Sequence, residues 1–285
     1  MLRGLGLATA AASVPKDYLL TPGGYTHRSC VHRISSSSFF SADSLVPCDF
    51  PMIPFRQEQG KKSSTSSSSS SSSTIKNVTH GSAWKTWAQS APGGSVTSLS
   101  SKWTVPGEPG NSAGQTLFFW NGIEPEDTSA VLQPVLQWGS SAAGGGNYWA
   151  YSSWYVSANH GSHFSELISV QEGDVVTGGN TLDAKSGIWN ITCSAPGRKP
   201  STLSFKPVPG AWPTAYHVLE AYGVTNTCNL YPAAGSVNFT NVQVSFDSKP
   251  VAPIQWTFET QTANCGEHTT ATNQGDEVTI HFNTN

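Results

Sequence analysis

A run of branched and aromatic residues, from Val131 to Trp138, carries two amide side chains that could take part in chemistry. Such residues favour a β-strand, in which successive side chains point to opposite faces. Gln133 and Gln137 therefore share one face with Val135, and the apolar residues between them point the other way. Burying an unpaired amide costs roughly 1–3 kcal/mol. These amides must either be hydrogen-bonded within the fold or line a cleft.

A carboxylate lies in a second predicted strand, Tyr216–Tyr222. The strand period of two places Glu220 on one face together with Tyr216, Val218 and Tyr222. A carboxylate among aromatic and apolar neighbours could serve as a general acid or base. The alternative is that Glu220 is a charge on the solvent-facing side of a sheet, which is a common place for glutamate.

Three segments of the chain carry a family resemblance. Residues 120–124 (Trp-Asn-Gly-Ile-Glu), followed by 131–133 (Val-Leu-Gln), resemble the Trp-Val-Gly-Ile-Asp … Ile-Leu-Gln signature of the eqolisin-type glutamic peptidases. Residues 215–220 (Ala-Tyr-His-Val-Leu-Glu) resemble the family segment Ala-Glu-Phe-Ile-Ile-Glu, at a similar distance along the chain. The resemblance runs from about residue 82 to about residue 244.

The resemblance implies that Gln133 and Glu220 are the catalytic pair of a peptidase. Glu220 would take a proton from a bound water and later return it to the leaving amine, while Gln133 would orient that water and donate to the oxyanion. A carboxylate with an ordinary pKa of about 4.3 can work as a base in acid. We expect an acid endopeptidase that acts on protein or peptide substrates without a cofactor or a metal.

Further residues are expected to line the substrate cleft: Trp84, Trp120, Trp154, Glu124 and Gln137. For each tryptophan the alternative is core packing. Gln137 is also the second candidate for the catalytic amide, because it shares the face of Gln133.

Some positions depart from the family pattern. Ser153 stands where the family's aromatic strand has Glu, and Glu124 stands where its signature has Asp. A Gly-rich insertion, Gly144–Gly146, and a longer loop, Ser157–His163, are expected near the cleft. These departures bear on substrate preference and pH optimum, and they leave both catalytic candidates in place.

The composition favours an all-β fold, since aromatic residues are frequent, charged residues are only 12%, and turn residues separate many short apolar runs. Many short strands predict a sandwich or a barrel. The resemblance implies a two-sheet antiparallel β-sandwich, similar to lectin jelly rolls. The expected strands are 84–87, 96–105, 116–123, 130–138, 148–156, 167–170, 175–177, 188–193, 202–205, 216–222, 237–246, 253–258 and 277–282.

Three regions are expected along the chain. Residues 1–59 form an irregular leader with a weak signal-like start, residues 60–76 form a Ser-rich flexible linker, and residues 77–285 form the catalytic sandwich. Residues 1–76 hold eight Lys or Arg and four Asp or Glu (+4), whereas residues 77–285 hold seven and fourteen (−7). A basic leader would dock at neutral pH and loosen as carboxylates protonate, as an acid-activated pro-segment does. The alternative is that this charge difference between the two parts of the chain arises by chance.

The five cysteines allow at most two disulfides, and we expect Cys228 to pair with Cys265. Cys30 and Cys48 would close a loop within the leader. His27, Cys30 and His32 could form a metal cluster, but a basic surface strand is favoured because no fourth ligand is suggested.

The chain is expected to be a secreted glycoprotein and a monomer. Candidate glycosylation sites are Asn77, Asn190 and Asn238. No apolar run is long enough for a transmembrane helix, and no basic stripe suggests nucleic-acid binding.

Two other functions remain open. A carbohydrate-binding module would need aromatic side chains aligned on one exposed face. A sandwich-type glycoside hydrolase would need two carboxyl groups about 5–9.5 Å apart. Candidate partners of Glu220 for that reaction are Glu124, Glu126, Asp127 and Glu166.

Overall fold

The structure is a computed structural model that describes residues 14–35, 38–53, 83–207, 210–261 and 263–283. Within these ranges nearly all regular structure is strand, and helix is limited to three short 3-10 turns: η1 (Arg28–Cys30), η2 (Ala42–Ser44) and η3 (Cys228–Leu230). None of these turns is long and apolar enough to cross a membrane. The predicted all-β class is confirmed.

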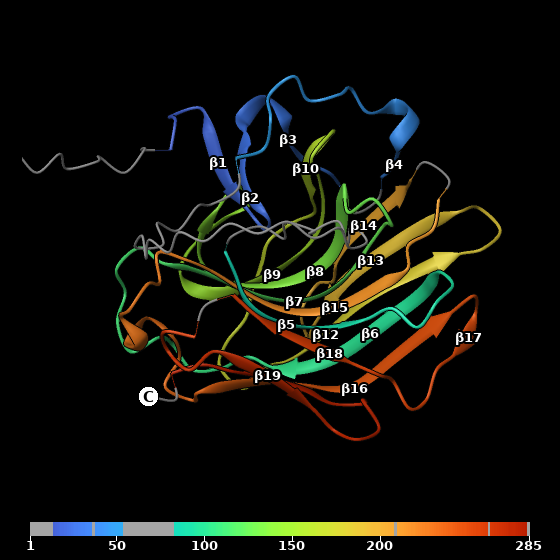
Figure 1. Cartoon of the computed structure of the whole chain (residues 1–285). Helices are drawn as coiled ribbons and strands as arrows, with labels where there is room; N and C mark the ends of the chain where they lie inside the picture. Colours follow the sequence, from blue (N-terminus) through green and yellow to red (C-terminus); the bar gives the residue numbers. More distant parts are fainter. Residues whose placement is uncertain (1–13, 36–37, 54–82, 208–209, 262, 284–285) are drawn as a thin grey trace, which may run out of the picture.

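Two sheets pack face to face as a sandwich (Figure 1). The first sheet has the strand order β18 (Thr257–Thr260), β5 (Trp84–Ser90), β15 (Thr214–Tyr222), β7 (Thr116–Glu124), β8 (Ala130–Ser141), β9 (Gly144–Ser157), β10 (Gly161–Phe164) and β3 (Val31–Arg33), with β11 (Ile168–Ser169) beside β9. The second has the order β19 (His268–Ala271), β20 (Val278–His281), β16 (Ser236–Phe246), β6 (Val96–Thr104), β12 (Val175–Asp183), β13 (Ile188–Ser194), β14 (Ser201–Lys206) and β4 (Phe39–Ser41), with β17 (Lys249–Pro250) beside β16.

Both faces of the first sheet are buried, which explains why β7 and β8 read as nearly continuous apolar runs. One face packs against the second sheet and forms the main core. The other carries a second apolar cluster, which we call the covered face. It consists of Ala83, Trp84, Trp87, Phe118, Trp120, Val131, Val135, Trp154, Val156, Phe164, Tyr216, Val218 and Tyr222.

The leader, here residues 14–53, folds onto this domain. Strands β1 (Tyr18–Thr21) and β2 (Gly24–His27) form a hairpin, while β3 and β4 extend the two large sheets in parallel with β10 and β14. A disulfide joins Cys30 and Cys48. These residues thus form strands where the sequence suggested an irregular leader, because their backbone groups pair with each other in the β1–β2 hairpin and with the edges of the two sheets. The two parallel pairs also depart from a purely antiparallel sandwich.

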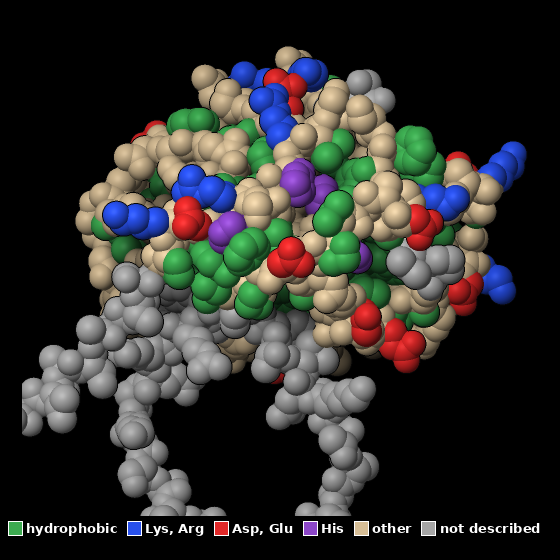
Figure 2. Space-filling model, turned by 90° about the horizontal axis from the view of Figure 1, so that it is seen from above, with side chains coloured by type: hydrophobic (Ala, Val, Ile, Leu, Met, Phe, Trp, Pro, Cys, Tyr) green, Lys and Arg blue, Asp and Glu red, His purple; other side chains and the backbone are tan. Residues whose placement is uncertain are grey.

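The leader lies over the covered face, above β8 and β9 (Figure 1). Leu20, Tyr25, Val31 and Met52 pack against its apolar cluster. Seen from this side, Lys, Arg and His side chains are scattered over the surface (Figure 2). The leader thus closes a surface that would otherwise expose several tryptophans.

Other differences from the sequence prediction involve glycine and proline. Gly144–Gly146 begin β9 and Gly178–Gly179 lie inside β12, so both strands extend beyond the expected ranges 148–156 and 175–177. A Cβ at Gly178 would lie 2.4 Å from Cη2 of Trp103, so a buried indole fills the space. The expected loop 157–163 contains the start of β10, and the strand expected from Pro253 begins only at Thr257. The expected linker, 60–76, lies outside the described residues.

Candidate active site

The sheet register brings the predicted site residues onto one diagonal of the covered face. Trp120 on β7 pairs with Val135 of β8 and Val218 of β15. Gln133 and Glu220 each lie two residues from those partners, so they are diagonal neighbours of Trp120 on opposite sides. Diagonal neighbours in a sheet are about 7–8 Å apart, within reach of long side chains. Gln133 and Glu220 therefore flank Trp120 and do not pair with each other.

The other two predicted tryptophans lie at the ends of this diagonal. Trp84 on β5 is in register with Glu220, and its ring centroid lies 4.9 Å from that of Trp120. Trp154 on β9 is in register with Gln133. The order across the face is thus Trp84, Glu220, Trp120, Gln133, Trp154.

Gly122, two residues after Trp120, makes room for its indole. A Cβ at Gly122 would lie 2.9 Å from Cζ3 of Trp120 and 2.8 Å from the carbonyl oxygen of Leu132. The Trp-x-Gly spacing of the sequence signature thus has a physical cause, because the tryptophan ring lies over the glycine two residues on.

Glu220 is fully buried and only partly hydrogen-bonded. Its Oε1 accepts hydrogen bonds from the Tyr222 hydroxyl and, at 2.6 Å, from the backbone N–H of Gly23. Its Oε2 has no partner among the described residues. Burial raises the pKa of Glu220 to about 7, while the bonds from Tyr222 and Gly23 and a contribution from Trp120 act in the opposite direction.

The two candidate amides differ sharply. Gln133 is fully buried, and within the described part of the chain neither its oxygen nor its nitrogen has a partner. Gln137 donates to the carbonyl oxygens of Gly139 (2.8 Å) and Gly144 (3.0 Å) and accepts from Ser141 (2.7 Å). Gln137 therefore fastens the β8–β9 hairpin, and Gln133 retains the capacity to bind water or substrate.

The leader reaches the carboxylate through its β1–β2 turn. Besides the Gly23 contact, the Tyr222 hydroxyl lies 3.5 Å from the carbonyl oxygen of Thr21, and the Tyr25 ring meets the Tyr222 ring edge-on. The Leu20 carbonyl accepts from the N–H of Ala142 at 2.7 Å. Leader backbone therefore occupies the space above Glu220.

Glu124 is a buried carboxylate on the same face, but it lies far from Glu220. It pairs in register with Thr214, six residues from Glu220 on β15, or about 20 Å at about 3.3 Å per residue. Burial raises the pKa of Glu124 to about 8, partly offset by a hydrogen bond with Tyr216. This spacing does not suit the two carboxyl groups of a glycoside hydrolase.

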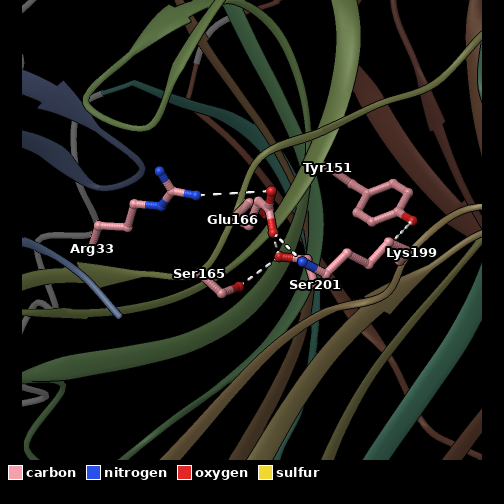
Figure 3. Close-up of polar contacts among 6 residues, drawn as sticks. All are labelled: Arg33, Tyr151, Ser165, Glu166, Lys199 and Ser201. Atoms are coloured by element: carbon pink, nitrogen blue, oxygen red, sulfur yellow. Dashed lines mark hydrogen bonds and ion pairs between the residues drawn. The ribbon is translucent and has the colours of Figure 1, made fainter. Parts of the chain in front are cut away.

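The other candidate carboxylates do not join Glu220 either. Glu126 and Asp127 follow Glu124 in the exposed β7–β8 turn. Glu166 lies at the surface, where its carboxylate contacts Lys199 at 2.6 Å and Arg33 of the leader at 3.9 Å (Figure 3). Lys199, with a smaller contribution from Arg33, lowers the pKa of Glu166. Glu166 thus ties the leader to the domain.

Ser153 occupies the position where the family has Glu, and its partner Ser201 is drawn in Figure 3. Ser153 donates to the carbonyl oxygen of Ser201 at 2.8 Å, and the Ser201 hydroxyl contacts Ser165. Because successive side chains of β9 point to opposite faces, Ser153 points away from the covered face, on which Trp154 lies. This departure therefore alters the packing between the sheets and leaves the diagonal unchanged.

Two groups that contact Glu220, Tyr222 and Gly23, were not among the site residues predicted from the sequence. Tyr222 was placed on the correct face, and its spacing of two from Glu220 was the signal that it could bond the carboxylate. Gly23 gave no signal, because its contact joins segments 197 residues apart. Among the described residues, no group of three His, Cys, Asp or Glu side chains is arranged to hold a metal ion; Cys30 of the proposed His–Cys–His cluster is in a disulfide.

Fold and site together define a β-sandwich with a buried carboxylate and a buried amide on an aromatic sheet face, the amide having no partner among the residues described. Residues 82–282 match the Peptidase A4 family. The structure is similar to the crystal structure of scytalido-glutamic peptidase with a peptide-based transition-state analogue, at 20% identity and a TM-score of 0.51, covering 70% of this chain and 98% of that one. It also resembles SCP-B, a member of the eqolisin family, in complex with the tripeptide Ala-Ile-His, at 18% identity and a TM-score of 0.49, covering 70% and 97%. None of the curated protein sequences matches the chain.

The chain belongs to the Peptidase A4 family, the eqolisin-type glutamic peptidases. It is accordingly a hydrolase of the peptidase class, as the sequence resemblance predicted.

Proposed function

We propose that this protein is a secreted glutamic endopeptidase that cleaves peptide bonds in acid, with Glu220 as general base and acid and Gln133 as the oxyanion donor. The observation that carries the proposal is the diagonal Glu220–Trp120–Gln133. Both polar residues on it have buried atoms without partners among the described residues. Leaving such atoms unsatisfied costs roughly 1–3 kcal/mol each, which favours a functional reason for them.

The chemistry follows from the two side chains. A peptide carbonyl above Trp120 would lie between them. Ionised Glu220 takes a proton from the attacking water through Oε2 and then returns it to the leaving amine. The Gln133 carbonyl oxygen orients the water, and its NH2 group donates to the tetrahedral oxyanion. Trp84 and Trp154 wall the ends of the site.

The leader would keep this enzyme latent. It places the Gly23 N–H on Glu220 and covers the face on which a substrate would lie. In this covered state the pKa of Glu220 is about 7, so the carboxylate is protonated in acid and cannot act as a base. Displacing the leader admits water, removes the desolvation, and lowers the pKa toward its ordinary value of about 4.3. Acid activity therefore requires leader displacement.

Secretion is supported by the disulfides Cys30–Cys48 and Cys228–Cys265, since such bonds persist in oxidising compartments. Asn190 and Asn238 lie on strands of the second sheet, with Asn238 exposed, and they remain candidates for glycosylation. Asn77 lies outside the described residues.

The test compares the full-length chain with Glu220→Gln on a denatured protein substrate from pH 2 to 7. The variant is nearly isosteric and removes the base, so we expect hydrolysis to fall by about 100-fold or more with thermal unfolding unchanged. Equal rates in both proteins would reject Glu220 as the base. If limited proteolysis shows that the leader has been released and the wild type still hydrolyses nothing at any pH, the peptidase is rejected, and sugar binding would then be tested next.

A further inference from the structure

Tyr222 contacts Glu220 from the same strand. Its hydroxyl donates to Oε1 of Glu220, and both side chains are buried, with exposures of 3% and 0%. Residues two apart in a strand share a face, so this contact is local to β15 and does not depend on the leader. Phe118 on β7 packs edge-on against the Tyr222 ring, with centroids 6.0 Å apart, and restrains it.

The tyrosine remains a donor throughout the working range of a carboxylate base. Burial, followed by the charge of Glu220, raises the pKa of Tyr222 well above its ordinary value. The titratable groups that act on it are Glu220 on its own strand and Tyr25 of the leader. Because Tyr222 keeps its proton, its hydroxyl can donate to Oε1 of Glu220 across this range, and Oε2 is left with no partner among the described residues.

We propose that Tyr222 is a positioning residue of the peptidase site, which holds Oε1 of Glu220 so that Oε2 is the oxygen that takes the proton from water. This inference rests on the proposed role of Glu220. The second donor to Oε1 is the N–H of Gly23, which departs with the leader. Among the described residues, Tyr222 is therefore the donor to Oε1 that remains in the opened enzyme.

The expected signature is a shift in pH dependence. The hydrogen bond from Tyr222 lowers the pKa of Glu220, so Tyr222→Phe raises it. Hydrogen bonds to charged groups have a strength that corresponds to about one pH unit or slightly more. The acid limb of the activity profile should move upward by about one unit, with kcat reduced about tenfold below the new pKa. KM should stay unchanged, because Tyr222 binds the carboxylate and not the peptide.

The matched control is Tyr231→Phe, which removes the same phenol–carboxylate bond at Glu267. Tyr231 belongs to the main core and Tyr222 to the covered face, so the control should leave the profile in place. Tyr222 also contacts the leader, but a loosened leader would increase activity at a given pH, whereas loss of positioning decreases it. An unshifted Tyr222→Phe profile with normal kcat would overturn the proposal.

A second readout does not depend on turnover. The infrared carboxyl band of Glu220 can be titrated as the difference between each full-length protein and its Glu220→Gln counterpart. An upward shift of the midpoint in Tyr222→Phe supports the inference even if no hydrolysis is found, in which case only the peptidase assignment fails. An unchanged midpoint contradicts the inference whatever the activity.

Discussion

Two buried carboxylates, each bonded by a tyrosine, lie in different regions of this molecule. Glu267, next to the Cys228–Cys265 disulfide, accepts from the Tyr231 hydroxyl at 2.9 Å and from the N–H of Cys265 at 2.7 Å, so both oxygens are bonded. The charge of Glu267 also acts on the buried Lys85. Within the described ranges, Glu220 has donors on one oxygen only, and one of them comes from the leader.

Under the proposed function, this difference separates a structural carboxylate, Glu267, from the catalytic one, Glu220. Both residues are almost fully buried, so burial alone does not distinguish them. The number of hydrogen-bonded oxygens does distinguish Glu220 from Glu267. A buried oxygen without a partner lowers stability, so its presence points to a function. The amides show the same contrast: Gln137 is fully bonded within a hairpin, and Gln133 has no partner in the part of the chain that the structure describes.

The largest expected effect separates the two amides. Gln133→Ala removes the oxyanion donor and should reduce kcat by about 100- to 1000-fold. Gln137→Ala instead releases the β8–β9 hairpin and should lower the free energy of unfolding by about 1–3 kcal/mol. Turnover and chemical denaturation of both variants provide the measurement. A larger loss of kcat in Gln137→Ala would exchange the two assignments.

A second effect concerns leader release, in which His163 is central. It is aligned with His32 of β3 in the leader, and its ring stacks on Phe40 of β4 at 4.9 Å. Burial, followed by the charges of His32 and His160, lowers the pKa of His163 to about 3; Tyr155 is the other titratable ring beside it.

The lowered pKa of His163 determines how leader closure depends on pH. A histidine with a depressed pKa stabilises the closed state above its ordinary value of about 6.5, and that contribution disappears as the pH falls toward 3. Glu220 has the opposite effect on leader closure. Its raised pKa stabilises the closed state below about pH 4.5, and this contribution is lost as the pH rises through about 7.

His163→Phe removes the histidine contribution and keeps the stacked ring. Leader release, followed by limited proteolysis against pH, should then move to lower pH by about one unit. His268→Phe, at the opposite edge strand β19 of the second sheet, is the control and should not move it. Release at an unchanged pH in His163→Phe would show that another group opens the leader.

The smallest expected effect is at Gly23. Its φ of +91° is strained for other residues, although a Cβ there would meet only ordinary contacts at 3.5 and 3.6 Å. Gly23→Ala keeps the N–H donor and should weaken leader closure by about 1 kcal/mol, or about fivefold in the open population. Initial hydrolysis rates would report it. Gly93→Ala, at a similar φ in an open loop, should not raise those rates.

The sequence was sufficient to predict the sandwich and which residues share a face of its central strands, because side-chain alternation and turn residues are local features. It placed Gln133 and Gln137 on one face and Tyr222 beside Glu220. It could not show that one amide is bonded by a hairpin and the other is not, since that depends on how β8 continues into β9.

Long-range contacts account for the remaining differences. The leader pairs in parallel with strands more than 100 residues away, and no local pattern encodes that pairing. Gly178 lies in a strand because Trp103 of a neighbouring strand occupies the space of its side chain. Gly23 is required by a turn over Glu220, and only the folded chain brings the two together.

The most direct test of the contrast is a crossed measurement on Glu220→Gln and Glu267→Gln. Acid hydrolysis and thermal unfolding would be recorded for both full-length variants beside the wild type. We predict that Glu220→Gln loses hydrolysis and keeps its unfolding temperature, while Glu267→Gln keeps hydrolysis and loses about 1–3 kcal/mol of stability. Loss of hydrolysis in Glu267→Gln with retention in Glu220→Gln would contradict the assignment of the catalytic carboxylate.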